Sequence, residues 1–418
     1  MIQFDSFTLD NGLRVLVHED HSVQIAVMNV LYDVGSRDEH PDKTGFAHLF
    51  EHLMFGGSLN VPSYDEPLQK VGGENNAFTS TDITNYYLTV PAANIETGFW
   101  LESDRMLSLS FDSKVLEVQR KVVIEEFKQR YLNQPYGDVW LKLRPLAYKV
   151  HPYQWATIGK EISHIENATL NDVRDFFFTH YVPNNAILVM AGNVRMEQIK
   201  QLAEKWFGPI PSGKRISRKL AEEPAQNEKR ILEIEADVPA NALYKAWHVP
   251  GRFHDDYYTS DLLSDVLGRG HSSRLYQQLV KEKEIFASIS SFLTGTIDPG
   301  LLVVSGRLRD GIHFEQAEQE LESILQAIVE QGITEAELEK VKNQVESSLE
   351  FEKVEVINRA MNLAFFALSG DAGLVNLEAE KIEAVTAADI QRQARKILRP
   401  ENSNTLLYKS VKHQGLKK

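Results

Sequence analysis

Residues 169–191, TLNDVRDFFFTHYVPNNAILVMA, contain the pattern that decides the fold. Apolar residues at helical spacing run from Thr169 to His180. Pro183 follows, and because proline cannot continue a helix, the helix is expected to end before it. The apolar run at 186–191 is typical of a buried strand. The stretch therefore predicts a helix, a proline stop and a returning strand.

The same pattern recurs in the second half of the chain, 217 positions later and without a gap. The corresponding pairs are Thr169 and Thr386, Asp172 and Asp389, Pro183 and Pro400, and Asn185 and Asn402. Each half also begins with strand-like sequence, a hairpin at 7–20 in the first and strands at 231–249 in the second. Repetition of one plan indicates an internal duplication. We therefore expect an α/β (α+β) fold made of two homologous domains.

The chain length supports two domains, because 418 residues are too many for one ordinary core. The best linker is the polar, charged stretch at 214–229, which follows a short segment rich in glycine and proline. We therefore predict an N-terminal domain at 1–213 and a C-terminal domain at 230–418.

Composition excludes several classes of function. The chain has no cysteine, which excludes disulfides, a thiol nucleophile and a cysteine-based zinc site. The net charge of −14 disfavours nucleic acid as a partner. No apolar run is long enough to span a bilayer, and no signal peptide opens the sequence. We expect a cytoplasmic protein with no membrane partner, or a periplasmic one if a leader has been removed.

The strongest chemical signal is His48-Leu49-Phe50-Glu51-His52, which lies inside the first clear helical pattern. At this spacing His48, Glu51 and His52 project from one face of a helix, so two imidazoles can bind one ion beside a carboxylate. Zinc suits this ligand type and lowers the pKa of a bound water, whose proton Glu51 would take. A merely solvated polar stripe is the alternative, but the helix is otherwise apolar.

A third ligand is expected from the helix that contains Glu125 and Glu126. Glu126 follows Val122 and Val123 at helical spacing, which favours it as the inward-facing residue, with Glu125 as the alternative. Gln119 lies on the same face and is a candidate for orienting a ligand through a hydrogen bond.

Three motifs together resemble the insulinase/pitrilysin family of zinc peptidases. They are His-x-x-Glu-His at 48–52, Gln-Arg-x-Val-Val-x-x-Glu at 119–126, and Gly72-Gly73-Glu74-Asn75-Asn76-Ala77-Phe78-Thr79-Ser80. The likeness spans nearly the whole chain and is greatest to short bacterial members related to mitochondrial processing peptidase. Such proteins have two homologous domains, each a mainly antiparallel sheet covered by helices, and two chains pair into a clam-like chamber.

The resemblance implies a role for each matching residue. His48, His52 and Glu126 match the zinc ligands, and Glu51 matches the general base. The segment Asn76-Ala77-Phe78-Thr79 matches the edge strand that binds substrate as an added strand through main-chain hydrogen bonds.

One departure from the family is expected to matter. Members that complete their own active site have an Arg and, seven residues later, a Tyr in the second domain, where they help to stabilise the tetrahedral intermediate. The matching positions here are Val280 and Ala287, with Lys281 and Lys283 as possible substitutes. We therefore expect this chain to be the zinc-bearing subunit of a heterodimer whose zinc-less homologue supplies the Arg and Tyr, with a homodimer as the other arrangement.

The predicted function is a zinc-dependent endopeptidase that hydrolyses short or unfolded peptides. The alternative is a peptide-binding or structural subunit of the same family without activity of its own. A nucleotide site at Gly268-Arg269-Gly270 is disfavoured, because the preceding sequence is expected to be helical rather than a strand.

Overall fold

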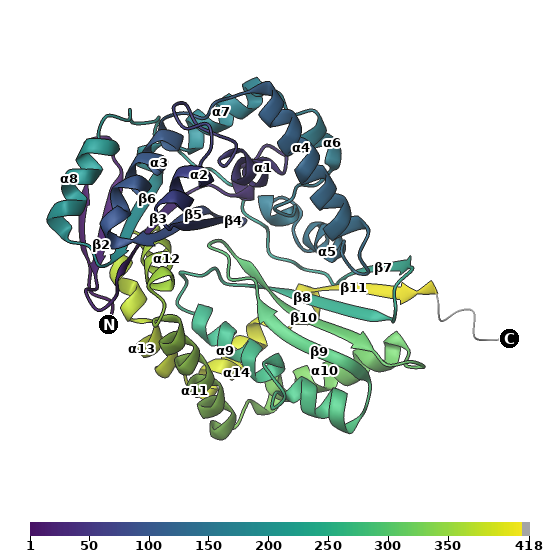
Figure 1. Ribbon diagram of the computed structural model, residues 1–418. Helices are drawn as coiled ribbons and strands as arrows, with labels where there is room; N and C mark the ends of the chain where they lie inside the picture. Colours follow the sequence, from purple (N-terminus) through teal and green to yellow (C-terminus); the bar gives the residue numbers. More distant parts are fainter. Residues whose placement is uncertain (412–418) are drawn as a thin grey trace. The chain divides into compact units, whose positions relative to one another are not determined.

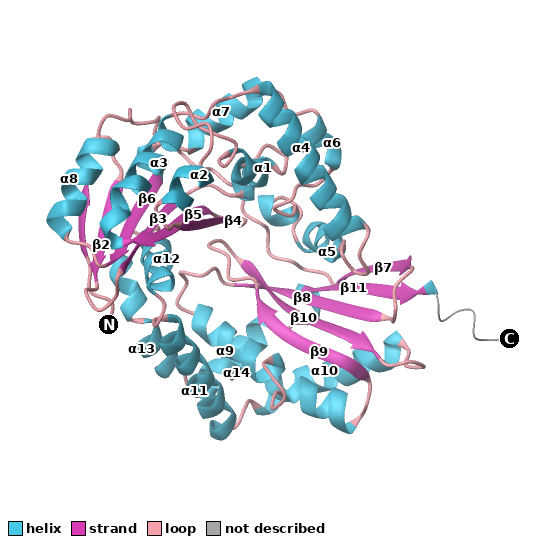
Figure 2. Ribbon diagram, viewed as in Figure 1, coloured by secondary structure: helices cyan, strands magenta, loops and turns pink. Residues whose placement is uncertain are grey.

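A computed structural model describes residues 1–411, which form two compact α/β units (Figures 1 and 2). Unit 1 consists of Met1–Lys128, Trp155–Leu220 and Leu349–Glu378. Unit 2 consists of Gln129–Gln154, Ala221–Ser348 and the chain from Ala379. The predicted fold class is confirmed. The predicted domains, 1–213 and 230–418, did not anticipate that each unit takes a segment from the other half of the chain.

Unit 1 is built on a six-stranded sheet. Its strands are β1 (Asp5–Thr8), β2 (Arg14–Glu19), β3 (Ile25–Tyr32), β4 (Glu74–Thr79), β5 (Thr84–Pro91) and β6 (Ala186–Gly192), in the order β1-β2-β6-β3-β5-β4. Every neighbouring pair is antiparallel except β2 and β6, which are parallel. The order leaves β4 at one edge of the sheet, so one side of its backbone has no neighbouring strand among residues 1–411.

Helices cover both faces of this sheet. The helices of unit 1 are α1 (Phe46–Leu53), α2 (Asp65–Lys70), α3 (Ile95–Leu107), α4 (Ser113–Phe127), α6 (Ile162–Glu166), α7 (Leu170–His180), α8 (Met196–Trp206) and α12 (Val356–Ala367). Short 3-10 turns are η1 (Ser36–Asp38), η2 (Ala92–Asn94), η5 (Pro183–Asn185) and η7 (Ala372–Asn376). Figure 1 shows α3 on one face of the sheet and α12 on the other.

Unit 2 is built on a five-stranded sheet. Its strands are β7 (Arg230–Ala236), β8 (Ala242–Val249), β9 (Phe286–Leu293), β10 (Gly300–Leu308) and β11 (Ser403–Ser410), in the order β7-β11-β8-β10-β9. The longer helices are α5 (Val139–Ala147), α9 (Tyr257–Gly268), α10 (Phe314–Gln331), α11 (Glu335–Glu352), α13 (Glu378–Glu383) and α14 (Ala387–Ile397). Shorter ones are the 3-10 turns η4 (Pro152–Gln154) and η8 (Pro400–Asn402) and the π-helical segments η3 (Lys128–Leu132) and η6 (Tyr276–Glu282).

The two sheets have the same topology. Apart from β1, the order β2-β6-β3-β5-β4 in unit 1 corresponds to the order β7-β11-β8-β10-β9 in unit 2. In each sheet the first two strands of this order are parallel to each other, β2 to β6 and β7 to β11. Thr169 and Thr386 both cap a helix by accepting the N–H of the aspartate three residues later. The repeat in the sequence is therefore a repeat of structure.

The repeated asparagines explain why the motif recurs. The Asn185 side-chain amide donates to His180 O at 2.9 Å and to Asp33 O at 3.1 Å, and that of Asn402 donates to Ile397 O at 2.9 Å and to His248 O at 3.2 Å. In each unit one side chain thus joins the end of a helix to the end of a central strand. The bonds to His180 O and Ile397 O satisfy carbonyls that the helix ends leave without a partner.

The exchanged segments follow the same duplication. Helix α5 packs against β7, β8 and β11 of unit 2, and α12, which begins 217 positions later, packs against β2, β3 and β6 of unit 1. Tyr136 donates its hydroxyl to Ala240 O at 2.7 Å, and Arg14 donates to Ala367 O at 2.7 Å. Each half of the chain thus supplies one covering helix to the sheet of the other half.

Candidate metal centre

Helix α1 presents its apolar side to the core and its polar trio to a less buried face. Its buried residues are Phe46, Ala47, Leu49, Phe50 and Leu53. His48, Glu51 and His52 are each only partly buried, so the 3.6-residue period of the helix places all three on the remaining face. This is the arrangement expected from the sequence.

Glu126 of α4 comes to the same place. Its Oε2 lies 3.6 Å from His48 Nε2 and 3.5 Å from His52 Nε2, and one ligand atom from each of the three residues lies within 4.8 Å of the others. Zinc ligands at about 2.1 Å from the ion, in tetrahedral geometry, stand roughly 3.4 Å apart. Two imidazole nitrogens and one carboxylate oxygen at this spacing fit zinc and leave a fourth position open.

Glu125 lies outside this cluster. Its side chain is 60% exposed and pairs with Lys128 at 2.8 Å. Of the two valines that favoured Glu126 as the inward-facing residue, Val123 is buried but Val122 is 44% exposed. Gln119 is half-buried on α4 and its side chain makes no hydrogen bond within residues 1–411, so its orienting role stays a prediction.

Glu51 is held by the edge strand. Thr79, the last residue of β4, donates its hydroxyl to Glu51 Oε2 at 2.6 Å. The contact joins the general-base candidate on α1 to the strand where substrate was expected. The sequence indicates both residues but not this bond, because the two side chains meet only after β4 pairs with β5.

The segment Asn76-Ala77-Phe78-Thr79 lies on β4, with Phe78 38% exposed. The backbone N–H of Ala77 donates to the Asn76 side-chain oxygen at 2.8 Å rather than to β5. A donor that bonds to a neighbouring side chain in this way faces the unpaired edge of the sheet, where a further strand could bind it.

Glu39 is a residue of this region that the sequence did not indicate. Its two carboxyl oxygens accept the backbone N–H groups of Gly45 at 2.9 Å and Ala47 at 2.8 Å, at the start of α1. Burial raises the pKa of Glu39 to about 8, against the effect of these two bonds, which favour the ionised form. No local motif marks this contact.

Known proteins share this organisation. The family described as Insulinase (Peptidase family M16) matches residues 14–154, and the one described as Peptidase M16 inactive domain matches 167–345. Zinc protease PqqE of Helicobacter pylori is 32% identical over 344 residues, which cover 81% of this chain and 77% of that protein. The chain belongs to the insulinase family.

Two further likenesses agree with this assignment. The crystal structure of a protease from Helicobacter pylori superimposes with a TM-score of 0.93 at 28% identity, covering 98% of this chain and all of that one. The probable β subunit of mitochondrial processing peptidase from Arabidopsis thaliana is 26% identical over 360 residues, or 82% of this chain and 66% of that subunit. The predicted family and its predicted relation to processing peptidases are confirmed.

The positions expected from the family resemblance to match an Arg and a Tyr lie in unit 2. Val280 is buried on η6, and Ala287 is exposed on the edge strand β9. The nearby Arg274 is committed elsewhere, since it forms two hydrogen bonds of 2.6 and 2.8 Å with Glu337. Tyr276 stacks on the ring of His271. Lys283 bonds to Glu320, and Lys281 is exposed.

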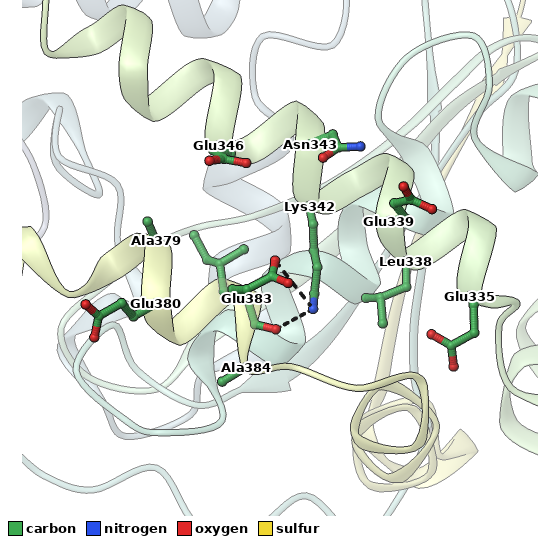
Figure 3. Close-up of a pocket in the computed structure, with 11 residues that line it drawn as sticks. Glu335, Leu338, Glu339, Lys342, Asn343, Glu346, Ala379, Glu380, Glu383 and Ala384 are labelled. Atoms are coloured by element: carbon green, nitrogen blue, oxygen red, sulfur yellow. Dashed lines mark hydrogen bonds and ion pairs between the residues drawn. The ribbon is translucent and has the colours of Figure 1, made fainter.

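One hollow of unit 2 is lined by several carboxylates but is not a candidate metal site. It measures about 1010 Å³ between α11 and α13, and Figure 3 shows Lys342 at its centre, bonded to Glu383. The other acidic residues around it are Glu335, Glu339, Glu346 and Glu380. No histidine lines it, and these carboxylates belong to the solvated sides of the two helices.

Among residues 1–411, no helix combines the length and apolar composition needed to cross a membrane.

Proposed function

We propose that this member of the insulinase family is a zinc-dependent endopeptidase. The observation that carries the proposal is the convergence of His48, His52 and Glu126, with Glu51 on the same helix face. The names of relatives as zinc proteases support zinc as the ion. Zinc, when bound, would polarise the scissile carbonyl and lower the pKa of a water in its open position.

Two side chains of this protein act in the proton transfers of the proposed reaction, Glu51 as the base and Thr79 by orienting it. Glu51 takes the proton from the attacking water and later delivers it to the departing amine, which is general acid–base catalysis by one carboxylate. Thr79 fixes the orientation of Glu51 through the 2.6 Å hydrogen bond. Because Thr79 ends β4, the same strand aligns the peptide and the base.

Substrate binding is proposed to occur on the free edge of β4. An extended peptide added there would bond to outward-facing groups such as the Ala77 N–H, displacing the Asn76 side chain that now accepts it. Main-chain recognition tolerates many sequences and requires an extended peptide, which favours short or unfolded substrates.

The active site is proposed to be completed by a zinc-less homologue in a heterodimer. Val280 and Ala287 cannot donate hydrogen bonds from their side chains, and Arg274 is occupied by Glu337. Without donors at those positions, the chain would stabilise the tetrahedral intermediate poorly on its own. The second candidate function, a peptide-binding subunit without activity, is favoured by the same absence of donors.

The test is Glu51→Gln, which keeps the shape of the side chain but removes the base. We expect this variant to bind as much zinc as the unchanged protein and to lose at least about a thousandfold in kcat on a quenched fluorescent peptide, in the range of general acid–base effects. A variant that retains most of the activity would contradict the assignment of the base. A protein with peptide affinity but no activity in any mixture would support the binding subunit.

A further inference from the structure

The helix that holds the two histidines lacks a cap of its own. Its N-cap residue is Gly45, in the left-handed region at φ 88°, and no side chain of that residue can bond to the first turn. The four leading N–H groups of a helix need partners. Glu39 accepts two of them from six and eight residues away in sequence, with one oxygen bonded to the Gly45 N–H and the other to the Ala47 N–H, and the residue is only 5% exposed.

The residue before the cap is fixed as well. The Thr44 backbone N–H donates to His164 Nδ1 at 3.1 Å, and the Thr44 hydroxyl lies 2.9 Å from the same nitrogen. That hydroxyl also accepts the Lys160 N–H at 2.7 Å. A side chain at Gly45 would come within 2.6 Å of Ile158 O, so the backbones at 45 and 158 are in close contact.

The same region is joined to the helix that supplies Glu126. Arg120 of α4 donates to Glu166 O at 2.7 Å and to Ala168 O at 3.2 Å, at the end of α6. His164, which bonds to Thr44, lies on α6. Helix α6 therefore connects the start of α1 to the helix of the third ligand.

This network matters because α1 has only eight residues. Helices this short are not stable alone and take their position from packing and from bonds at their ends. A shift of α1 along its axis would move His48 and His52 together relative to Glu126, which lies on another helix. Metal affinity depends on ligand distances to a few tenths of an ångström.

We propose that Glu39 is a positioning residue of the metal centre, which sets the place of α1 through the Gly45 and Ala47 amides, with His164 supporting it through Thr44. The inference rests on the proposed function, because it assigns Glu39 a role toward the same zinc site. Glu39 touches neither the ion nor the substrate, and acts only through the backbone of α1.

The test measures zinc affinity by competition with a chromophoric chelator, together with thermal unfolding of the metal-free protein. The variants are Glu39→Gln, which keeps the side-chain volume and one acceptor oxygen, and His164→Ala. The matched control is Glu223→Gln, since Glu223 also accepts backbone N–H groups, those of Lys149, Val150 and His151, but lies in unit 2.

We expect Glu39→Gln to weaken zinc binding about 10- to 100-fold, as for other residues that support metal ligands, and to lower kcat without changing KM. His164→Ala should weaken binding less, and Glu223→Gln should change only the unfolding temperature. Zinc affinity within twofold of the unchanged protein in Glu39→Gln would overturn the inference and leave the proposed function standing. An unchanged protein that binds no zinc would overturn the proposed function itself.

Discussion

The bond from Thr79 to Glu51 gives a sharp prediction about the general base. Thr79→Val replaces the hydroxyl by a methyl group of the same shape, so the strand β4 and its backbone are kept while the 2.6 Å bond is lost. Hydrogen bonds to charged groups contribute about 1.5–3 kcal/mol, and the lower end applies here because Glu51 is only partly buried. At about 1.4 kcal/mol per tenfold in rate, kcat should fall about tenfold.

The assay is peptide cleavage under steady-state conditions, with zinc content measured in the same samples. KM should stay within about twofold, because Thr79→Val leaves the main-chain groups that bind the peptide in place. Thr79→Ser is the matched control, since it keeps the hydroxyl and should keep most of the activity. An unchanged kcat in Thr79→Val, or an equal loss in Thr79→Ser, would refute the idea that this hydroxyl orients the base.

Three further predictions concern other parts of the chain. Ala77→Pro removes the outward N–H of the edge strand, and should raise KM about tenfold with zinc content unchanged; an unaltered KM in peptide-cleavage assays would argue against strand addition. Arg105→Met leaves the buried Glu102 carboxylate without the guanidinium that donates hydrogen bonds of 2.8 and 2.6 Å to it. The free energy of unfolding, measured in urea, should fall by about 3–5 kcal/mol, and the double change Glu102→Gln with Arg105→Met should recover part of this loss. Arg274 lowers the pKa of Glu337 from 4.5 to about 2, so the stability from this pair is present above pH 4.5 and is lost as the pH falls toward 2. In acid-unfolding curves, Glu337→Gln should remove this pH dependence of the unfolding free energy, which is worth about 1 kcal/mol. A curve parallel to that of the unchanged protein would show that the pair contributes nothing.

Much of the fold could be predicted from sequence because its signals are local. The repeat at 217 positions depends on threonine caps, proline stops and a following apolar strand, and each of these acts within about twenty residues. The exchange of α5 and α12 could not be predicted in this way. Which sheet a helix covers depends on packing between segments far apart in the chain, and the periodicity of the helix alone does not specify its partner.

In the candidate site too, residues placed by local spacing could be predicted and residues placed by long-range contacts could not. His48, Glu51 and His52 share a helix, so their spacing alone places them on one face. Glu126 required a choice between two adjacent carboxylates, which helical phase could guide but not prove. Glu39 could not be found from the sequence, because it contacts backbone amides across a loop, and a glutamate six residues before the N-cap residue of a helix has no distinctive pattern.

The departure at Val280 and Ala287 came from the family resemblance rather than from physical reasoning on the sequence. The structure adds that Arg274 and Tyr276 are engaged within unit 2, by Glu337 and His271. Whether a second subunit supplies the missing donors stays a prediction, which purification of the chain with and without its zinc-less homologue would test.

The most direct measurement is cleavage of a quenched fluorescent peptide library, with zinc content determined alongside, for the chain alone and mixed with its zinc-less homologue. We expect one zinc per chain, activity that is abolished by a chelator and by Glu51→Gln, and a large increase in rate in the mixture. Absence of both zinc and cleavage in every sample would contradict it, and would leave the peptide-binding subunit as the function to pursue.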